Sequence, residues 1–571
     1  MKLFCFLCFF CVFASSAGAL EREAFTIAKY DLEIRLEPEQ QRLGARGKIT
    51  LRNDSGQPQK IAALQISSSL NWRSIRVDGK AVQFISQPYT SDIDHTGTLS
   101  EAIVTLPVEV KPKDSVELEI GYEGVIRLDG TRLIRVGVPE GIAKHTSWDQ
   151  ISSSFTAVRG AGYVAWYPIT TESADFSEGN SLFEVVDRWK AREAQMGMEI
   201  NLCTPSTGPT LPHIAMNEPP RKTGSGGGDD NNICRGYRFE PLGTATPTFA
   251  VADYVSASKA PLNLLSLPGH ETGAATYSNA LEPAMKFVSG WFGQPTGEVT
   301  VADFADPHSA PFESGTLLMA SMAAEDSKLA GINLVHELVH AALPSSRPWV
   351  YEGSAHFAEA MYRQEQGGRQ AALDFLGVHR AAFLDSEKEV SAAPRKNAGQ
   401  KNGQALASTF DETYYRSKAA YVWWMLRDMV GDAALKQVIR KYRAEDDKDP
   451  KYVELLIESA AKRDLEWFFD DWVYQDRGLP DFHVQSVHPW KTDKGVQFIT
   501  VTLENLGNAG AEVPFTVFFE GGEITKRIEV RSKGTATTRV ELPQPPSEVR
   551  VNDGSIPESD LTNNEFKIST P

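Results

Sequence analysis

The hydrophobic pattern of this chain changes twice, and those two changes constrain its fold more than any other feature. From residue 24 to about 256, apolar and polar residues alternate in runs such as YDLEIRLEP and DSVELEIGYEG, the pattern of half-buried strands. After 257 the period becomes helical, and from about 484 strand alternation returns in VQFITVTLEN and VPFTVFFEGG. The sequence therefore predicts a multidomain α+β protein, β-rich at both ends and mostly helical between them.

A chain of 571 residues is too long for one continuous core, so the two changes of pattern are natural domain boundaries. We expect a β-rich N-terminal domain over 20–256, a mostly helical domain over 257–484 and a small β-sandwich of the Ig-like type over 485–571. Helical periodicity predicts helices at 275–292, 329–343, 349–365, 369–383, 415–430, 433–442 and 452–462, and a helix or extended arm at 182–198 within the β-rich domain.

The first nineteen residues have the pattern of a secretory signal peptide. A lysine precedes the apolar run from Leu3 to Phe13, and Ala17 and Ala19 form an A-x-A cleavage pattern. We expect cleavage after Ala19 and export, either to a periplasm or out of the cell. No later run approaches the roughly 20 apolar residues of a spanning helix, so no membrane span is expected in the mature chain.

Two cysteines, Cys203 and Cys234, follow the signal peptide, and in an oxidising compartment they most simply form one disulfide. Two unpaired thiols are the alternative. Between them, the Gly-rich and charged stretch 219–232 predicts an exposed loop, which is either a plain linker or a mobile element at the site. A second loop is expected at 392–404.

The formal charge of the chain indicates which classes of partner are unfavourable. With 58 basic and 75 acidic residues the net charge is −17, which argues against nucleic acid or an anionic lipid surface as the main partner. The sequence does not determine an oligomeric state.

The most informative motif is His336-Glu337-Leu338-Val339-His340. Two histidines four residues apart on a helix project from the same face and can hold one tetrahedral metal ion. Glu337 is then positioned to act as general base toward a water molecule that the metal activates. The motif predicts a metal-dependent hydrolase with His336 and His340 as ligands.

A third protein ligand is expected from the next helix, with Glu352, His356 and Glu359 as alternatives. Pro344 and Pro348 predict a short hairpin between the two helices. At about 1.5 Å rise per residue the midpoint of the two histidines lies about 7 Å from the hairpin end, Glu352 about 6 Å and Glu359 about 16 Å. Depth favours Glu352, and Glu359 is better suited to hydrogen-bond a ligand histidine.

The segment Trp349-Val350-Tyr351-Glu352-Gly353-Ser354-Ala355 resembles the W-L-x-E-G-x-A helix of the gluzincin aminopeptidases, the alanyl aminopeptidase and leukotriene hydrolase family. In that family the glutamate is the third zinc ligand, which the resemblance assigns to Glu352. The family usually has 18 residues between the second histidine and this glutamate, and this chain has 11. Related gluzincins with shortened hairpins also exist. The resemblance implies a thermolysin-like catalytic domain over 257–484.

Two further segments resemble motifs of the same family. Ala310-Pro311-Phe312-Glu313-Ser314 is similar to G-x-M-E-N, whose glutamate holds the substrate's free α-amino group, so the resemblance implies that role for Glu313. Tyr415-Arg416-Ser417-Lys418-Ala419 is similar to Y-E-K-G with one inserted residue, which implies that Tyr415 stabilises the oxyanion. Tyr414 is the alternative because the insertion leaves the register open.

Together these features predict a zinc metallopeptidase acting on peptides, with one Zn²⁺ held by His336, His340 and Glu352. Zinc is preferred because two histidines and a carboxylate with an open position suit hydrolysis, although the ligand types also admit another divalent ion. Removal of N-terminal residues is the expected activity. The alternatives are an endopeptidase on the same scaffold and a secreted binding protein that retains a relic metal site.

Overall fold

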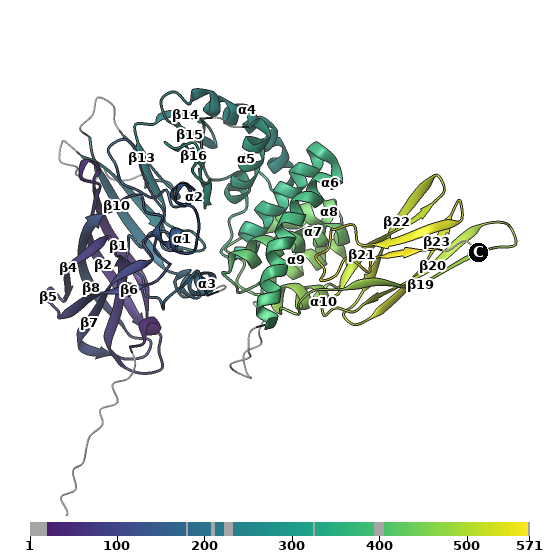
Figure 1. Ribbon diagram of the computed structural model, residues 1–571, viewed down its shortest axis with the longest axis horizontal. Helices are drawn as coiled ribbons and strands as arrows, with labels where there is room; N and C mark the ends of the chain where they lie inside the picture. The colour runs from purple at the N-terminus through teal and green to yellow at the C-terminus, as the bar shows by residue number, and fades with distance from the viewer. Residues whose placement is uncertain are drawn as a thin grey trace, which may run out of the picture.

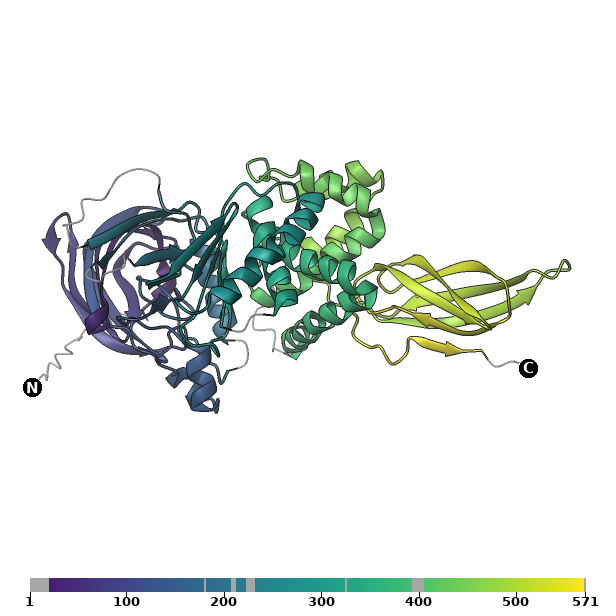
Figure 2. The same ribbon diagram turned by 90° about the horizontal axis from the view of Figure 1, so that it is seen from above.

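The computed structural model describes residues 20–178, 181–206, 212–221, 232–323, 326–392 and 405–568. These residues form a β-rich part, a mainly helical part and a second β part in a row (Figure 1, Figure 2). The expected signal peptide over 1–19, most of the Gly-rich loop over 219–232 and nearly all of the expected loop over 392–404 lie outside the described residues.

The N-terminal part is built around a seven-stranded sheet with the order β12-β10-β1-β2-β8-β4-β5. β1 and β10 pair in parallel, and the other neighbours pair antiparallel. Side chains along β1 alternate between buried and exposed, as the sequence pattern predicts. The strands are β1 (Phe25–Glu37), β2 (Arg42–Asn53), β4 (Leu70–Val77), β5 (Lys80–Ala81), β8 (Ser115–Val125), β10 (Gly197–Pro205) and β12 (Asn232–Phe239).

Two three-stranded sheets complete this part. They are β3 (Gln59–Ser67), β7 (Thr98–Val110) and β6 (Phe84–Thr90), and β11 (His213–Met216), β13 (Phe249–Ala252) and β9 (Thr156–Val158). The part also contains α1 (Thr131–Arg135), α2 (Glu140–Thr146) and α3 (Ser181–Glu193).

α3 is shorter than the helix expected at 182–198, because the chain turns after Glu193 and β10 begins at Gly197. The disulfide between Cys203 and Cys234 is confirmed, and it joins residues that face each other on β10 and β12.

A five-stranded sheet lies between the N-terminal part and the helices, with the order β14-β15-β16-β18-β17. The description of 257–484 as mostly helical omitted this sheet, because its strands are only three to five residues long and give little periodicity. The strands are β14 (Val255–Lys259), β15 (Leu262–Ser266), β16 (Val299–Ala302), β17 (Phe312–Ser314) and β18 (Leu317–Met319). β14 spans the boundary expected at 256/257, and β17 is an edge strand.

The helices agree with the predicted positions to within a few residues at most ends. The two helices predicted at 349–365 and 369–383 are confirmed as the two helical segments of α6, which Gly368 separates with a non-helical backbone (φ 79°, ψ 176°). The helices are α4 (Glu271–Trp291), α5 (Ser327–Ala342), α6 (Pro348–Ala392), the π-helix η3 (Thr413–Lys418), α7 (Ala419–Val430), α8 (Asp432–Lys441), α9 (Tyr452–Ala461), α10 (Glu466–Phe469) and the π-helix η4 (Asp470–Tyr474).

The C-terminal part consists of a three-stranded and a four-stranded sheet whose buried residues join the core of the helical part. The indole N–H of Trp472 donates to the carbonyl of Gly510 at 2.8 Å across this junction. The sheets are β19 (Phe482–Lys491), β20 (Gln497–Asn505) and β23 (Thr535–Leu542), and β22 (Gly522–Val530), β21 (Ala511–Phe519), β24 (Pro546–Val551) and β25 (Glu565–Lys567). An Ig-like assignment stays a prediction.

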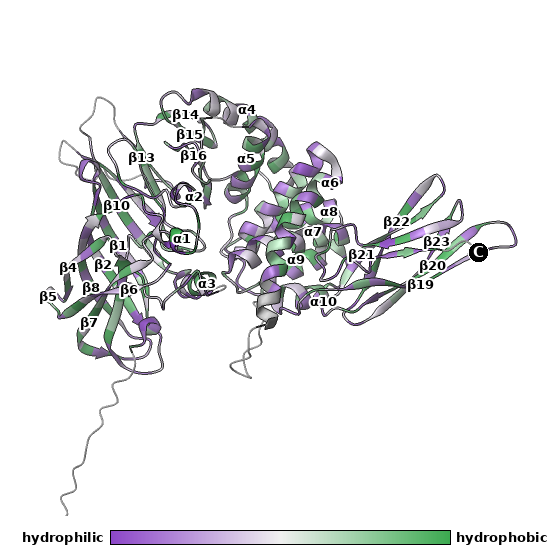
Figure 3. Cartoon of the chain, in the orientation of Figure 1, coloured by the Kyte–Doolittle hydropathy of each residue, from purple (hydrophilic) through white to green (hydrophobic). Residues whose placement is uncertain are grey.

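Hydrophilic and hydrophobic residues are mixed along the helices and strands in Figure 3. Among the described residues, no helix is long and apolar enough to cross a membrane.

Candidate metal centre

Two helices joined by a short hairpin place both histidines of the H-E-x-x-H motif in the interior. Asp326 caps α5 by accepting hydrogen bonds from the backbone N–H groups of Lys328 and Leu329, and Pro348 begins α6 as expected. His336 and His340 are 2% and 4% exposed. Their Nε2 atoms lie only 3.0 Å apart, as the four-residue spacing on one helix face predicts.

Glu352 completes a group of three ligand atoms from the two helices. Its Oε2 lies 3.8 Å from His336 Nε2, and its Oε1 lies 3.8 Å from His340 Nε2. All three ligand atoms lie within 4.8 Å of one another. Tetrahedral zinc with bonds of about 2.1 Å spaces its ligands about 3.4 Å apart, so these separations are close to what zinc needs.

Unpartnered polar atoms provide a separate test of whether a cation fits here. Glu352 Oε2 and both carboxylate oxygens of Glu337 are buried and have no hydrogen-bond partner among the described residues. Burial of such groups is costly unless something compensates them. The donor set therefore fits a divalent cation held by His336, His340 and Glu352, with the carboxylate of Glu337 beside it.

Glu359 determines which nitrogen of His336 faces the group. Its Oε1 lies 2.8 Å from His336 Nδ1, which indicates that Nδ1 carries the proton and Nε2 keeps its lone pair. Glu359 also lies 3.2 Å from His356 Nδ1 and 3.9 Å from a guanidinium nitrogen of Arg363. Glu359 therefore orients the imidazole of His336. Glu352, by contrast, lies between the two histidines.

The electrostatics of the site also favour a cation. Burial lowers the pKa of His336, but the carboxylates of Glu313, Glu359 and Glu352 together raise it to about 10. Burial lowers the pKa of His340, and the neighbouring imidazole of His336 lowers it further. The carboxylates thus favour positive charge at His336, which a metal ion would supply instead, while His340 is held neutral with a lone pair for a ligand bond.

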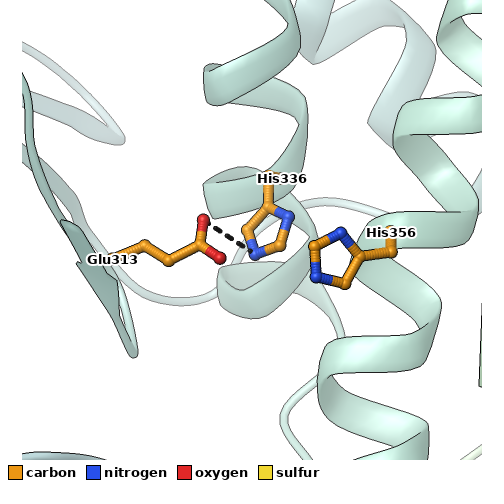
Figure 4. Close-up of side chains that lie close together, drawn as sticks. All are labelled: Glu313, His336 and His356. Carbon is orange, nitrogen blue, oxygen red and sulfur yellow. Dashed lines mark ion pairs between the residues drawn. The ribbon is translucent and has the colours of Figure 1, made fainter. Parts of the chain in front are cut away.

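A second group of possible ligands overlaps the first. Glu313, His336 and His356 also place three ligand atoms within 4.8 Å of one another, and Figure 4 shows Glu313 approaching His336 opposite His356. Glu313 Oε2 lies 3.4 Å from His336 Nε2. Because the Nε2 atom of His336 can ligate only one ion, the two groups are alternative ligand sets and not two separate sites. In the second group, moreover, Glu313 Oε1 is already paired with Arg416 Nη1 at 3.0 Å.

A cavity of about 270 Å³ opens beside the metal group, with Glu313 of the edge strand β17 in its wall. The N-terminal part contributes walls that sequence reasoning did not place. The charged and hydroxyl-bearing walls of the cavity include Lys190, Glu313, Glu352, Glu412, Tyr415 and Arg416.

The structure distinguishes the two tyrosines of the predicted oxyanion motif by position. Tyr415 lines the cavity, whereas the Tyr414 hydroxyl donates to Glu387 Oε1 at 3.1 Å. Burial raises the pKa of Tyr415, and the negative charge of Glu412 raises it further. Tyr415 therefore stays protonated and able to donate.

Arg416, like Lys190 and Glu412, is a charged residue of the cavity that the sequence did not point to. Its guanidinium contacts Glu313, and its Nε lies 3.6 Å from Glu352 Oε2. The sequence feature that could have pointed to Arg416 was the extra residue after Tyr415. That residue lies in a π-helix, a form that accommodates one residue more per turn than an α-helix and often occurs at functional sites.

Comparison with protein-family models finds no match, and comparison with curated proteins finds none either. Among solved structures, the chain is similar to an M1 zinc metallopeptidase from Deinococcus radiodurans, a glutamate-to-alanine mutant bound to a Tyr-Ser-Ala substrate. Identity is 14% and the TM-score 0.46, over 80% of this chain and 96% of that one.

A second similar structure is a two-domain M1 zinc metallopeptidase mutant bound to L-tryptophan, with 15% identity and a TM-score of 0.48 over the same shares. The structural neighbours are thus M1 zinc metallopeptidases. Because both TM-scores lie below 0.5, these likenesses carry no argument about the chemistry of this chain.

Proposed function

We propose that this chain is an exported zinc metallopeptidase that removes residues from the N-termini of peptides. The observation that carries the proposal is the convergence of His336, His340 and Glu352 on one point, beside the buried and unpartnered carboxylate of Glu337. Export follows from the signal peptide expected over 1–19. The thermolysin-like catalytic domain and the Ig-like C-terminal domain belong to the same proposal.

When bound, zinc supplies Lewis acidity, which polarises a carbonyl group and lowers the pKa of water. Glu337 accepts a proton from the attacking water on its carboxylate and delivers it to the nitrogen of the leaving amine. Both carboxylate oxygens of Glu337 are buried and have no hydrogen-bond partner among the described residues, so they can hold that proton between the two steps.

Two cavity residues act on the substrate. Tyr415 donates its hydroxyl proton in a hydrogen bond to the carbonyl oxygen as negative charge develops there. Glu313 pairs with the substrate's terminal ammonium and so selects the end of a peptide over its interior. In this role the ammonium competes with Arg416, which is paired with Glu313 Oε1 at 3.0 Å.

The decisive experiment combines a zinc assay with a peptide digest. Purified mature chain should contain one zinc ion and shorten a peptide mixture from its N-termini, as followed by mass spectrometry. Glu337→Gln should keep the metal and lose at least about 100-fold in kcat, since general acid–base catalysis contributes about 10² to 10⁴. Full activity in that variant would refute the proposed base.

Two rival functions have distinct outcomes. An endopeptidase would cleave a free and an N-acetylated aminoacyl-arylamide at equal rates, whereas an aminopeptidase would cleave only the free one. Metal without turnover of any peptide would favour a binding protein with a relic site.

A further inference from the structure

Glu313 and Arg416 form an ion pair within the wall of the cavity. Arg416 Nη1 lies 3.0 Å from Glu313 Oε1, and the two side chains are 27% and 26% exposed. They come from distant elements, the edge strand β17 and the π-helix η3, and both line the cavity beside the metal group. A substrate ammonium that binds Glu313 therefore competes with a guanidinium for the same carboxylate.

That competition has a cost that depends on the substrate. To the extent that Glu313 pairs with an ammonium, Arg416 depends on its contact of 3.6 Å with Glu352 Oε2 and on the charge of Glu412, and a half-buried cation without a close partner is unfavourable. A carboxylate on the substrate would restore a charge-assisted hydrogen bond to the guanidinium. One ion pair is then exchanged for two.

The position of Arg416 limits where that carboxylate can lie. Because Arg416 contacts the same carboxylate that would hold the ammonium, the substrate's negative group must lie close to its amine. The side chain of an N-terminal Asp or Glu meets this condition, whereas the C-terminus of a peptide chain lies several residues away.

Lys190 is the second cation in this cavity wall. Its Nζ lies 3.6 Å from Glu412 Oε1, and its side chain is 6% exposed. The charge of Glu412 also acts on Tyr415, so this pair belongs to the tyrosine side of the cavity. The guanidinium of Arg416 is therefore the cation placed beside Glu313.

We propose that the Glu313–Arg416 pair makes this site selective for peptides whose first residue is aspartate or glutamate. The inference rests on the proposed aminopeptidase function and adds its substrate class. The reaction remains hydrolysis: water adds across the first peptide bond and releases the acidic residue. N-terminal Lys or Arg is disfavoured, because its cation would face the guanidinium.

The test compares aspartyl-, asparaginyl- and lysyl-arylamides on the zinc-loaded chain. A charged hydrogen bond contributes about 1.5 to 3 kcal/mol, so kcat/KM for the aspartyl substrate should exceed that for the asparaginyl one by about 10-fold to 100-fold. The lysyl substrate should be the slowest. Equal rates for the aspartyl and asparaginyl substrates would overturn the inference and leave the aminopeptidase proposal intact, whereas hydrolysis of none would overturn both.

Variants assign the selectivity to one residue. Arg416→Gln should lower the aspartyl-to-asparaginyl ratio to within about threefold of one, and Arg416→Lys should keep part of it. Lys190→Gln is the matched control and should keep the ratio. Loss of the ratio in Lys190→Gln but not in Arg416→Gln would overturn the assignment.

Calorimetry on the unmutated zinc-loaded chain provides a readout that needs neither turnover nor a folded variant. L-aspartate should bind at least about 10-fold more tightly than L-asparagine. Equal affinity for the two amino acids would contradict the inference even if every Arg416 variant failed to fold.

Discussion

At the scale of single residues, the site depends on which atoms face His336. Its Nδ1 is held by Glu359, while its Nε2 faces His340, Glu352 and Glu313. An imidazole nitrogen has one lone pair and can ligate one ion. The two overlapping ligand groups therefore make different predictions about the remaining histidines.

We expect His340→Ala to abolish stoichiometric zinc binding, because it removes a ligand. His356→Ala should keep the ligand set and retain one zinc ion per chain. The measurement is metal content after dialysis, together with the rise in melting temperature on adding zinc, which reports binding to the folded state. If the two variants behave the other way round, the ion belongs to the group formed by Glu313, His336 and His356.

At the scale of elements, the packing of α6 against α7 explains why a glycine follows Glu352 in the E-G-x-A segment of α6. A Cβ added to Gly353 would lie 2.5 Å from the Cβ of Ala419 at the start of α7, and 3.2 Å from the ring of Trp423. Only glycine lets α6 and α7 approach this closely next to Glu352.

Gly353→Ala should therefore destabilise the chain by about 1 to 3 kcal/mol, the usual cost of overpacking, and should weaken zinc binding by moving Glu352. Gly377→Ala is the matched control, because Gly377 lies in the helical segment of α6 that follows Gly368 and has open space around it. It should be neutral or stabilising by up to about 1 kcal/mol. Melting curves and zinc titrations measure both variants. An unchanged Gly353→Ala chain would show that the helices can separate at no cost.

The π-helix η3 separates the roles of two adjacent tyrosines. Tyr415→Phe should lower kcat by about 10²-fold to 10³-fold with little change in metal content, since it removes a donor to the developing oxyanion. Tyr414→Phe removes a hydroxyl that contacts Glu387, away from the cavity, and should keep kcat within about threefold. Steady-state kinetics on one arylamide compares them. A larger loss in Tyr414→Phe would reverse the assignment.

At the scale of the whole molecule, the cavity is closed by parts that are far apart in the sequence. Lys190 of α3 pairs with Glu412 next to η3, so the N-terminal part contacts the helical part at the cavity wall. The helical and C-terminal parts share one hydrophobic core. The stability of each part therefore bears on the shape of the site.

Glu193 makes the stability of the N-terminal part depend on pH. Burial raises its pKa to about 7, although the hydroxyl of Tyr30 donates to it and opposes the rise. The folded chain thus binds this proton more tightly than the unfolded chain, whose glutamate titrates near 4.3. The stabilisation is complete below about pH 4.3 and is lost as pH rises through about 7.

Glu193→Gln resembles the protonated side chain, so its stability does not depend on this titration. The free energy of unfolding of the variant, relative to that of the unmutated chain, should therefore increase from pH 5 to pH 8 by an amount on the order of 3 kcal/mol. Melting temperatures at the two pH values measure this difference. The control is Glu39→Gln, which replaces an exposed carboxylate near the end of β1. It should change the melting temperature by the same amount at pH 5 and at pH 8. A Glu193→Gln effect independent of pH would contradict the shifted pKa.

Local patterns were enough to predict much of this molecule, because they report interactions between residues close in sequence. The alternation of strands, the helices around the metal motif and the convergence of His336 and His340 all follow from a period of two or 3.6 residues. The depth of Glu352 followed from the helix rise and two prolines. The short strands of the five-stranded sheet escaped prediction because three to five residues carry too little periodicity.

Tertiary structure alone decided which residues share the cavity. Arg416 reaches Glu313 across about a hundred residues of sequence, and Lys190 reaches Glu412 from another part of the fold. Neither contact produces a periodic pattern in the sequence, because each depends on how whole elements pack. The sequence alone thus predicted a metal-binding helical hairpin between β-rich parts. The packing of distant elements decided which charged residues face a substrate there.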